Sequence, residues 1–335
     1  GLGAMGAGVL HTMHAMAGMR CVAAADLDPE RAAAAFEANG LGRDDLVFAD
    51  NGAAAAARAG ASAGGRGKPV ITQDGLELAR MDLDVVVEAT GSVEFGARVA
   101  YESILAGKHV LMLTVESDVV VGPILARMAR AAGVVYSLVA GDQPGAILEL
   151  VHWAESLGLQ IIAAGRGITM YPEDRHGAPG PEKRGRIWIS HNPKMANSFR
   201  DGTKAQIEMA AVSNATGLVP EVRGMHEPVV GVDDLARVFA LREHGGILSR
   251  AGVVDVANSV TPDGKPVRGG QVGNGVFVVV DSPHPGVERF LRQAFAHQGE
   301  HGAALFRPYH LTCVEVPVSI ARAALDGVAT AAPRG

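Results

Sequence analysis

The sequence has few cysteines, few aromatic residues and no long apolar runs. Cys21 and Cys313 are the two cysteines in 335 residues, so we expect no disulfide framework, a reducing compartment and a cytoplasmic protein. No apolar run approaches the ~20 residues of a membrane-spanning helix, so we expect no membrane partner. Aromatic residues make up 4% of the chain, which predicts a core of Ala, Val, Leu, Ile and Met.

Positive charge is also sparse. The formal net charge is −6, and Lys and Arg form no basic stripe, which argues against a nucleic-acid partner. Glycine is abundant instead: most of the 43 glycines stand where strands would turn into helices. With 48% hydrophobic and 20% charged residues, the composition is globular, and the length suits two domains.

The first 140 residues alternate between strand and helix patterns. Apolar strand candidates lie at 20–26, 69–72, 83–90, 108–114 and 133–141. Because these runs are apolar throughout rather than alternating, they indicate a parallel sheet buried on both faces. A helical pattern at 95–108 ends at Gly107, as a helix should. The sequence therefore predicts an α/β fold of the Rossmann type, with a doubly wound parallel sheet.

The pattern changes after about residue 150. Strands are expected at 159–167 and 275–281, and helices at 203–220 and 316–327, while 51–69 and 170–185 read as largely loop. Thr203 with Gln206 has the pattern of a capping box, and Gly217 marks the end of that helix. We divide the chain into a dinucleotide-binding domain (1–141), a second α/β (α+β) catalytic and oligomerisation domain (142–327) and a tail (328–335). The last helix is a candidate for packing back on the first domain.

The chain opens with "GLGAMG", which has the G-x-G-x-x-G spacing of a dinucleotide-binding loop. In that reading Gly1 allows the tight turn, Gly3 lets the backbone approach the pyrophosphate, and Gly6 lets the following helix pattern pack closely on a strand. The helix amino terminus would face the phosphates. Such a loop follows a strand, so we expect the first strand of the sheet upstream of Gly1. The alternative is a glycine-rich surface turn.

Asp26 supports the cofactor reading. It ends the strand pattern 20–26, twenty positions after Gly6, where a carboxylate binds the adenosine ribose hydroxyls. A carboxylate there repels the 2′-phosphate of NADP and so favours NAD. Arg31 lies close to Asp26 in the sequence, and its positive charge would weaken that preference. The candidate cofactor-binding residues are Gly1, Gly3, Ala4, Met5, Gly6, Asp26, Ala89, Thr90 and Gly91. His11 and His14 lie on the first helix pattern, where packing or surface roles are favoured over a metal site.

Polar residues follow several predicted strands, where ligands bind in parallel sheets. Asp142 in "GDQPG" either caps the next helix, with Pro144 at its first position, or contacts substrate, and both readings stay open. Glu116 and Asp118 in "TVESD" are candidate ligands for a divalent ion, with solvated loop carboxylates as the alternative.

In the second half, Lys204 stands at the start of a helix, where it either transfers a proton or forms an exposed pair with Glu208. Asn214 lies on the same helix. His226 in "GMHEP" and His310 in "RPYHLT" are further candidates, and Arg, Tyr, His and Glu315 gather before the last helix.

Several stretches together resemble a known family. They are "EATG", "AGKHVLMLTVE", "GVVYSLVAGDQPG", "DGTKAQIEMAAVSNATGLVP", "GMHEP", "GGILSRAGVVD", "GVFVVV" and "RPYHLTCVEVP". From Gly1 to about Leu325 the chain resembles the homoserine-dehydrogenase-like family that includes the deoxyxylulose-phosphate reductoisomerase-like (DRL) enzymes. The resemblance implies a Rossmann domain, a catalytic α/β domain and, in many members, a C-terminal SAF-type domain.

The resemblance also implies a nicotinamide-dependent oxidoreductase. The reductoisomerase-like members use NADPH to convert deoxyxylulose phosphate into methylerythritol phosphate. Homoserine dehydrogenases carry an Asn-Lys pair after "GKHV", and that lysine acts in their active site. Here the corresponding stretch is "LTVE", with Val115 and Glu116, which argues against homoserine as the substrate.

We therefore expect an NAD(P)-dependent enzyme acting on the CH–OH group of a small polar hydroxy or keto substrate, with or without isomerisation. Lys204 is the expected proton-transfer group, with His226 or His310 as alternatives, and Asp142, Glu116 and Asn214 position the substrate. Isomerisation would require a divalent metal, for which Glu116, Asp118 and Glu208 are the candidates. The alternatives are a homoserine-type or sugar-acid dehydrogenase and a non-catalytic NAD(P)-binding sensor. A homo-oligomer is expected.

Overall fold

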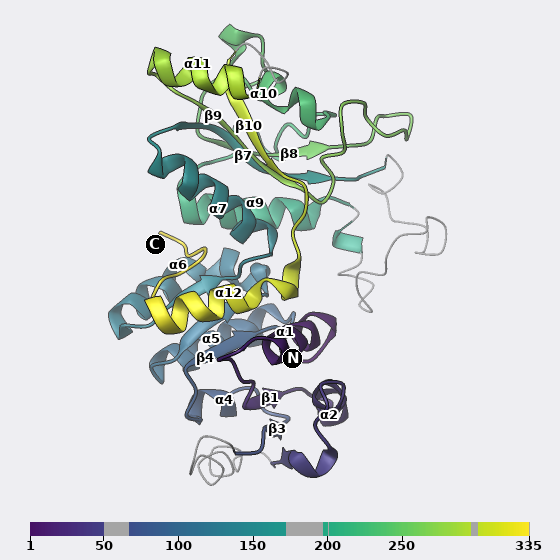
Figure 1. Ribbon diagram of the computed structural model, residues 1–335, viewed down its shortest axis with the longest axis vertical. Coiled ribbons are helices and arrows are strands. Elements are labelled where there is room, and N and C mark those ends of the chain that lie inside the picture. Colours follow the sequence, from purple (N-terminus) through teal and green to yellow (C-terminus); the bar gives the residue numbers. More distant parts are fainter. Residues whose placement is uncertain (50–66, 172–196, 200, 296–300, 335) are drawn as a thin grey trace. The chain divides into compact units, whose positions relative to one another are not determined.

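The computed structural model describes residues 1–49, 67–171, 197–199, 201–295 and 301–334 (Figure 1). The chain forms two compact units, Gly1–Asp142 with Leu311–Gly335, and Gln143–His310. The sequence-based division extended the second domain to residue 327, whereas the segment from Leu311 packs with the first unit. Most of the two predicted loops, 51–69 and 170–185, lies outside the described residues.

In the described part of the first unit, six short strands form two parallel sheets. One sheet has the order β1(Ala23–Ala25), β3(Val70–Thr72), β2(Val47–Phe48), and the other the order β4(Val85–Glu88), β5(His109–Met112), β6(Tyr136–Leu138). Every pairing in these sheets is parallel. The five strands predicted from apolar runs are confirmed, in shorter form, and β2 was not predicted.

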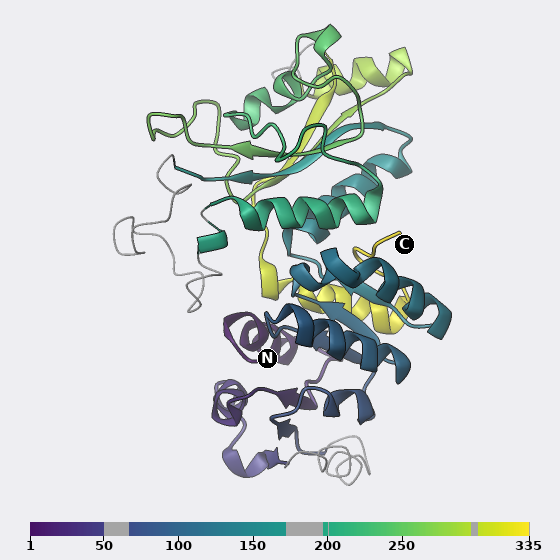
Figure 2. The same ribbon diagram turned by 180° about the vertical axis from the view of Figure 1, so that it is seen from behind.

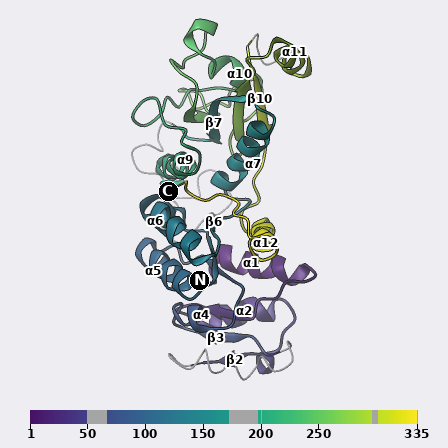
Figure 3. The ribbon, with the colours of Figure 1, turned by 90° about the vertical axis from the view of Figure 1, so that its left-hand side faces the viewer.

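Helices cover the strands of this unit on both sides. They are α1(Ala4–Ala15), α2(Pro29–Glu37), α4(Glu77–Arg80), α5(Val93–Leu105), α6(Val115–Ala132) and α12(Val316–Ala321), which continues into a π-helical turn, Arg322–Asp326. α1 and α12 lie on one side, where Val9, Val316 and Ile320 pack on Leu111 and Val139, and α5 and α6 lie on the other (Figure 3). The predicted doubly wound α/β architecture is confirmed.

A groove separates the two sheets between β1 and β4. Its volume is about 120 Å³, and its walls include Ala23–Ala25 on one side, Val85–Val87 on the other, and Val9, Leu10 and Met13 of α1. β1 pairs with β3 and β4 pairs with β5, so the two strands that line the groove are not paired with each other. The walls of the groove are apolar, as the surroundings of a strand buried on both faces must be.

The second unit contains a mixed four-stranded sheet. Its order is β10(Ala303–Arg307), β9(Val276–Asp281), β7(Gln160–Ile168), β8(Val253–Asn258). β7 and β8 are parallel, while β9 is antiparallel to both β7 and β10. This mixture gives the α/β (α+β) character expected of the second domain.

Helices cover both faces of this sheet. α7(Gln143–Ser156) and α9(Thr203–Thr216) lie along one face, and α10(Leu235–Val238) lies on the other (Figures 1 and 2). On the α10 face, Phe239 stacks on Phe277 with ring centroids 5.0 Å apart, in a core shared with Leu235, Ala163 and Val253. α11(Pro285–Ala294) connects β9 to the segment before β10. No helix in the described residues is long and apolar enough to cross a membrane.

Two local predictions were wrong. Glu116 and Asp118 do not lie in a loop after β5 but in the first turn of α6, which starts at Val115. Thr203 and Gln206 form no capping box: Gly202, in the left-handed region at φ +82°, precedes the helix, and the Gln206 side chain donates instead to the Gly224 carbonyl oxygen. The C-terminal end of this helix is as predicted, with Gly217 at φ +80°.

Candidate functional site

The glycine loop leads directly into α1. A Cβ on Gly6 would lie 1.9 Å from the carbonyl oxygen of Gly1, and one on Gly1 would lie 2.8 Å from that of Ala89. These two positions therefore require glycine because the backbone packs on itself. A Cβ on Gly3 would meet no atom within 4 Å. Gly3 thus presents exposed backbone at the N-terminus of α1, whose first turn holds no acidic residue.

Asp26 ties the end of β1 to this loop. Its Oδ2 accepts a hydrogen bond from the Leu2 backbone N–H at 2.6 Å, and its Oδ1 accepts one from Asp28 N–H at 2.9 Å. The Arg31 side chain is 56% exposed, and its guanidinium lies 3.6 Å from Oδ1 of Asp26. The Asp26 carboxylate therefore lies next to the glycine loop, as predicted. It is buried, and the positive charge of Arg31 lies near its Oδ1.

The third predicted cofactor segment, Ala89–Gly91, follows β4 and lies against the loop through Ala89. Both the backbone N–H and the hydroxyl of Thr90 donate to Oε1 of Glu88, at 2.7 and 2.5 Å. The Gly91 N–H donates to Oγ1 of Thr114 at 3.1 Å. Three segments far apart in sequence thus form one fixed surface at the ends of β1 and β4. Ala4 and Met5 lie exposed in the first turn of α1 on the same loop.

Two carboxylates of the first unit are buried, Glu88 at the end of β4 and Asp118 in α6. Tyr136 donates a hydrogen bond to Oδ1 of Asp118 at 3.0 Å. Burial raises the pKa of Asp118 to about 7, although the hydrogen bond from Tyr136 opposes the shift. Burial, and next the charge of Asp118, raise the pKa of Tyr136 well above its usual value. Asp118 Oδ2 and Glu88 Oε2 make no hydrogen bond among the described residues.

The three metal candidates belong to different units. Glu116 and Asp118 belong to α6 in the first unit, and Asp118 faces Tyr136. Glu208 belongs to α9 in the second unit, where it is fully buried and accepts a hydrogen bond from the Arg166 guanidinium. Within the described ranges no group of three or more His, Cys, Asp or Glu side chains is arranged to hold a metal ion. This set does not fit a divalent ion, and we assign no chemical step to one.

Lys204 is buried rather than exposed. It lies in the first turn of α9 with 7% of its surface accessible, and Asp201 orders the residue before it by accepting from the N–H and hydroxyl of Thr203, at 2.9 and 2.6 Å. Glu208 lies one turn further on the same face of the helix. Asn214 lies ten residues beyond Lys204, about 15 Å along the axis, so the two cannot contact the same atom of a small substrate.

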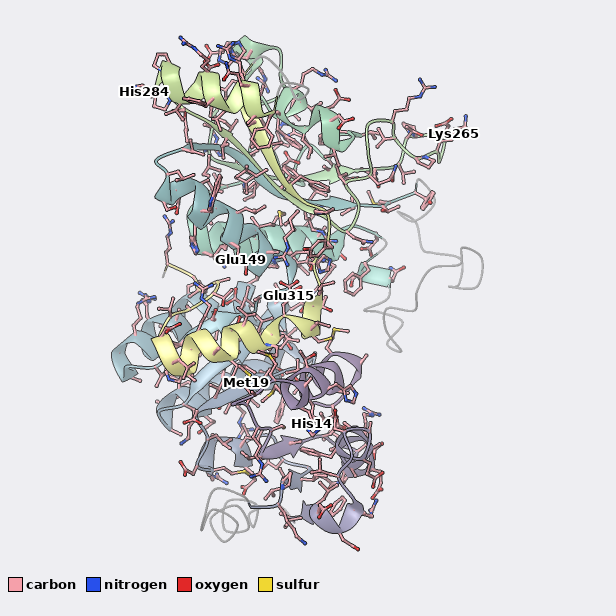
Figure 4. All side chains as sticks on the ribbon, viewed as in Figure 1. His14, Met19, Glu149, Lys265, His284 and Glu315 are labelled. Carbon is pink, nitrogen blue, oxygen red and sulfur yellow. The ribbon has the colours of Figure 1, made fainter. Side chains whose placement is uncertain are left out.

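Polar side chains also gather around α7. α7 begins at Gln143, one residue earlier than predicted, and the Gln143 side-chain nitrogen lies 2.8 Å from Nε2 of His310. Arg307 donates to Glu149, which is labelled in Figure 4, at 2.9 Å. Asp142 is half-buried and belongs to the first unit, as the last residue of the stretch Gly1–Asp142.

Three further residues singled out in the sequence, Glu315, His11 and His14, belong to the first unit. Glu315, also labelled in Figure 4, accepts from the Leu311 N–H at 2.8 Å within the first unit. On α1, His11 lies 2.8 Å from the Asn39 side-chain nitrogen, and His14 lies in the last turn. Neither histidine belongs to a metal cluster of the described chain.

His226 stands between two carboxylates. Its Nδ1 lies 2.7 Å from Oδ2 of Asp255, which is fully buried in β8, and its Nε2 lies 3.4 Å from Oε2 of Glu221. Two hydrogen bonds from Ser249 lower the pKa of Glu221, with smaller contributions from His226 and Arg242. Sequence reasoning found His226 but missed Asp255, Glu221 and Arg166. For Asp255 and Arg166 a signal existed, because each is a charged residue inside an apolar strand pattern.

Comparison with known proteins found a family model that matches the second unit and a few residues on either side of it. Residues 141–316 match the family model described as oxidoreductase DRL, catalytic domain. This stretch is more than half of the chain. The protein belongs to the oxidoreductase DRL family. No curated protein sequence matches the chain.

Solved structures resemble the chain distantly. They include a probable dehydrogenase from Thermotoga maritima (15% identity, 52% of this chain and 46% of that one, TM-score 0.36). Another is yvaA of Bacillus subtilis, described as an oxidoreductase (13%, 99% and 89%, TM-score 0.47). A third is 1-deoxy-D-xylulose 5-phosphate reductoisomerase from Zymomonas mobilis in complex with NADPH (14%, 84% and 65%, TM-score 0.42). The chain spans less than two thirds of the Thermotoga and Zymomonas chains, and the family assignment rests on the family model.

The DRL catalytic domain contains most of the candidate chemical groups. Arg166, Lys204, Glu208 and the cluster of Glu221, His226 and Asp255 all lie within residues 141–316, as do Asp142, Asn214 and His310. The glycine loop and Asp26 lie outside the matched region. The family match therefore covers these candidate groups and gives no information on the glycine loop or Asp26.

Proposed function

We propose that this DRL family member is an NAD(P)-dependent oxidoreductase that interconverts a CH–OH group and a carbonyl on a small polar substrate. The observation that carries the proposal is the 2.6 Å hydrogen bond from Leu2 N–H to Asp26, which joins the glycine loop to the carboxylate at the end of β1. Membership of an oxidoreductase family supports it. When bound, the nicotinamide would accept or supply the hydride.

The residues of the first unit fit a dinucleotide. The open side of Gly3 and the N-terminus of α1 would receive the pyrophosphate, and the Asp26 carboxylate would accept hydrogen bonds from ribose hydroxyls. The negative charge of Asp26 favours NAD. Arg31 lies 3.6 Å from that carboxylate and would offer a cation to a 2′-phosphate, so we expect NADPH to bind as well, but more weakly.

In the second unit, Lys204 and His226 are the proposed proton-transfer groups. The side chain of Lys204 is buried in the first turn of α9. The side chain of His226 is 18% exposed, and its Nδ1 lies 2.7 Å from Oδ2 of Asp255. His310, 2.8 Å from Gln143, is the alternative. Asp142 and Glu116 stay proposed substrate contacts, whereas the position of Asn214, far along α9 from Lys204, argues against a shared role.

The first experiment is a fluorescence titration of the protein with NADH and with NADPH. We expect saturable binding of both, with NADH tighter, in the wild type and in the control Asp263→Asn, an exposed residue paired with Lys265. We expect Asp26→Asn to bind NADH at least about 10-fold more weakly, because a charged hydrogen-bond acceptor is lost. Absence of binding by the folded wild type would contradict the cofactor proposal.

The substrate class is tested next by turnover of homoserine, sugar acids and 1-deoxy-D-xylulose 5-phosphate, each with and without Mg²⁺. Turnover of an alcohol without Mg²⁺ would support a simple dehydrogenase, and Mg²⁺-dependent conversion of the sugar phosphate would support a reductoisomerase. Binding of cofactor without turnover of any of them would favour a sensor. Homo-oligomeric assembly stays a prediction, and light scattering can check it.

A further inference from the structure

The loop that carries His226 has an unusual backbone. Met225 and Glu227, the residues on either side of His226, have φ values of +65° and +50°, a region that side-chain-bearing residues rarely adopt. Among the described residues only four other than glycine have positive φ, and two of them flank this histidine. Such strain persists only where surrounding interactions hold it, and it concentrates at functional sites.

The Asp255 carboxylate is what holds the loop. Asp255 is fully buried in the middle of β8, and it accepts hydrogen bonds from the backbone N–H groups of His226 and Glu227 at 3.1 Å each. Its Oδ2 also lies 2.7 Å from Nδ1 of His226. A buried carboxylate needs such donors, and here most come from one loop. The backbone and the imidazole ring of His226 are therefore fixed by the same group.

A second, independent set of contacts fixes Glu221. Its Oε1 accepts hydrogen bonds from the backbone N–H of Ser249 at 2.8 Å and from the Ser249 hydroxyl. Its Oε2 makes no hydrogen bond among the described residues, yet it is buried and lies 3.4 Å from Nε2 of His226. That separation is longer than an ordinary N–H···O hydrogen bond. Two anchored groups thus face each other without bonding to each other.

We propose that His226 and Glu221 are a proton-transfer pair that takes the hydroxyl proton of the substrate, and that Asp255 is the residue that positions His226. The proposal rests on the proposed oxidoreductase function, to which it adds Glu221 and Asp255. With Asp255 accepting a hydrogen bond from Nδ1–H, Nε2 is the nitrogen that faces Glu221 and would act as the base. Asp255 lies within hydrogen-bond distance of the ring and the Glu221 carboxylate lies 3.4 Å from it, so two negative groups would face the positive charge that the ring gains.

The proton step balances within these groups. The O–H bond of the substrate breaks and an N–H bond forms at Nε2, while the bonding electrons stay on the substrate oxygen. In the reverse direction, the same Nε2–H returns the proton to the oxygen as the alcohol forms. Oε2 of Glu221 accepts a hydrogen bond from the reacting hydroxyl or from the protonated ring.

The first test measures the ring itself, without substrate. In protein labelled with ¹⁵N-histidine, assigned with His226→Gln, we expect the neutral ring of His226 to carry its proton on Nδ1. Asp255→Asn, which keeps the side-chain shape, should abolish that preference, while His244→Gln should leave it unchanged, because His244 stacks on His301 and takes no part in the hydrogen bonds that hold His226. A wild-type ring protonated on Nε2 alone, or an Asp255→Asn ring unchanged, would overturn the positioning role.

The second test measures turnover of the substrate identified from the panel above. His226→Gln should lower kcat about 10²- to 10⁴-fold and Asp255→Asn at least about 10-fold, with cofactor binding unchanged. Glu221→Gln should lower kcat and alter its pH profile, and His244→Gln should match the wild type. Normal kcat in His226→Gln would overturn the catalytic role. Failure of all panel substrates would count against the proposed substrate class, while the ring measurement would still decide whether Asp255 positions His226.

Discussion

The backbone N–H of Leu2 donates a hydrogen bond to the side chain of Asp26 across 2.6 Å. This contact joins the second residue of the glycine loop to the last residue of the strand pattern that follows α1, twenty-four positions away. It places a buried carboxylate beside the exposed backbone of Gly3.

Two glycines of the opening loop should respond differently to alanine. In Gly6→Ala the new methyl would lie 1.9 Å from the Gly1 carbonyl oxygen, so we expect a loss of about 1–3 kcal/mol in the free energy of unfolding. In Gly3→Ala the methyl meets nothing within 4 Å, so stability should change by less than about 1 kcal/mol, while NADH binding weakens because the methyl blocks the pyrophosphate. Urea unfolding and cofactor titration measure the two effects. Equal stability losses in both variants would contradict this assignment.

Asp118 should make the stability of the protein depend on pH. Its pKa is raised to about 7 in the folded state from 3.8, so the native carboxyl holds its proton more tightly than the unfolded one. The free energy of unfolding should therefore fall as pH rises from about 4 to about 7, by up to about 4 kcal/mol. Asp118→Asn should remove this fall, and Asp263→Asn, at an exposed site, should keep it. A fall of the same size in Asp118→Asn would show that other groups cause it.

The buried pair of Arg166 and Glu208 should be costly to break. Glu208→Gln would leave the Arg166 guanidinium with 8% exposure beside a neutral partner, and we expect a loss of about 3 kcal/mol or more in the free energy of unfolding. The matched control is Glu288→Gln, which removes a pair with Arg292 on the surface of α11 and should cost less than about 0.5 kcal/mol. Denaturant unfolding of both variants compares them. A small loss in Glu208→Gln would mean that the charge of Arg166 is compensated elsewhere.

The groove between β1 and β4 should accept a strand. Its apolar walls, Ala23–Ala25 and Val85–Val87, present two strands that are not paired with each other. We expect protein carrying an apolar strand of about five residues directly before Gly1 to unfold at a higher temperature than protein without it. A strand of the same length with Pro and Asp in place of apolar residues is the control, since it can neither pair nor pack there. Equal melting temperatures for the two would contradict the prediction.

Local patterns were sufficient for the first unit. The apolar runs that became β1, β3, β4, β5 and β6 needed no long-range information, because a strand buried on both faces is apolar throughout. The glycine spacing and the position of Asp26 predicted that the two belong to one cofactor site, and in the structure the loop and Asp26 are joined by the hydrogen bond from Leu2. The same reasoning misplaced Glu116 and Asp118, because α6 begins with polar residues that look like a loop after a strand.

The sequence by itself determined five strands of the first unit, the doubly wound architecture and the glycine loop, since each depends on residues near one another in the chain. Only the tertiary structure decided which charged groups are engaged. Arg166 meets Glu208 across 42 positions and His226 meets Asp255 across 29, and no spacing rule connects such residues. The physical reason is that a buried charge is stable only with its partner, and the partner is supplied by whichever element packs beside it.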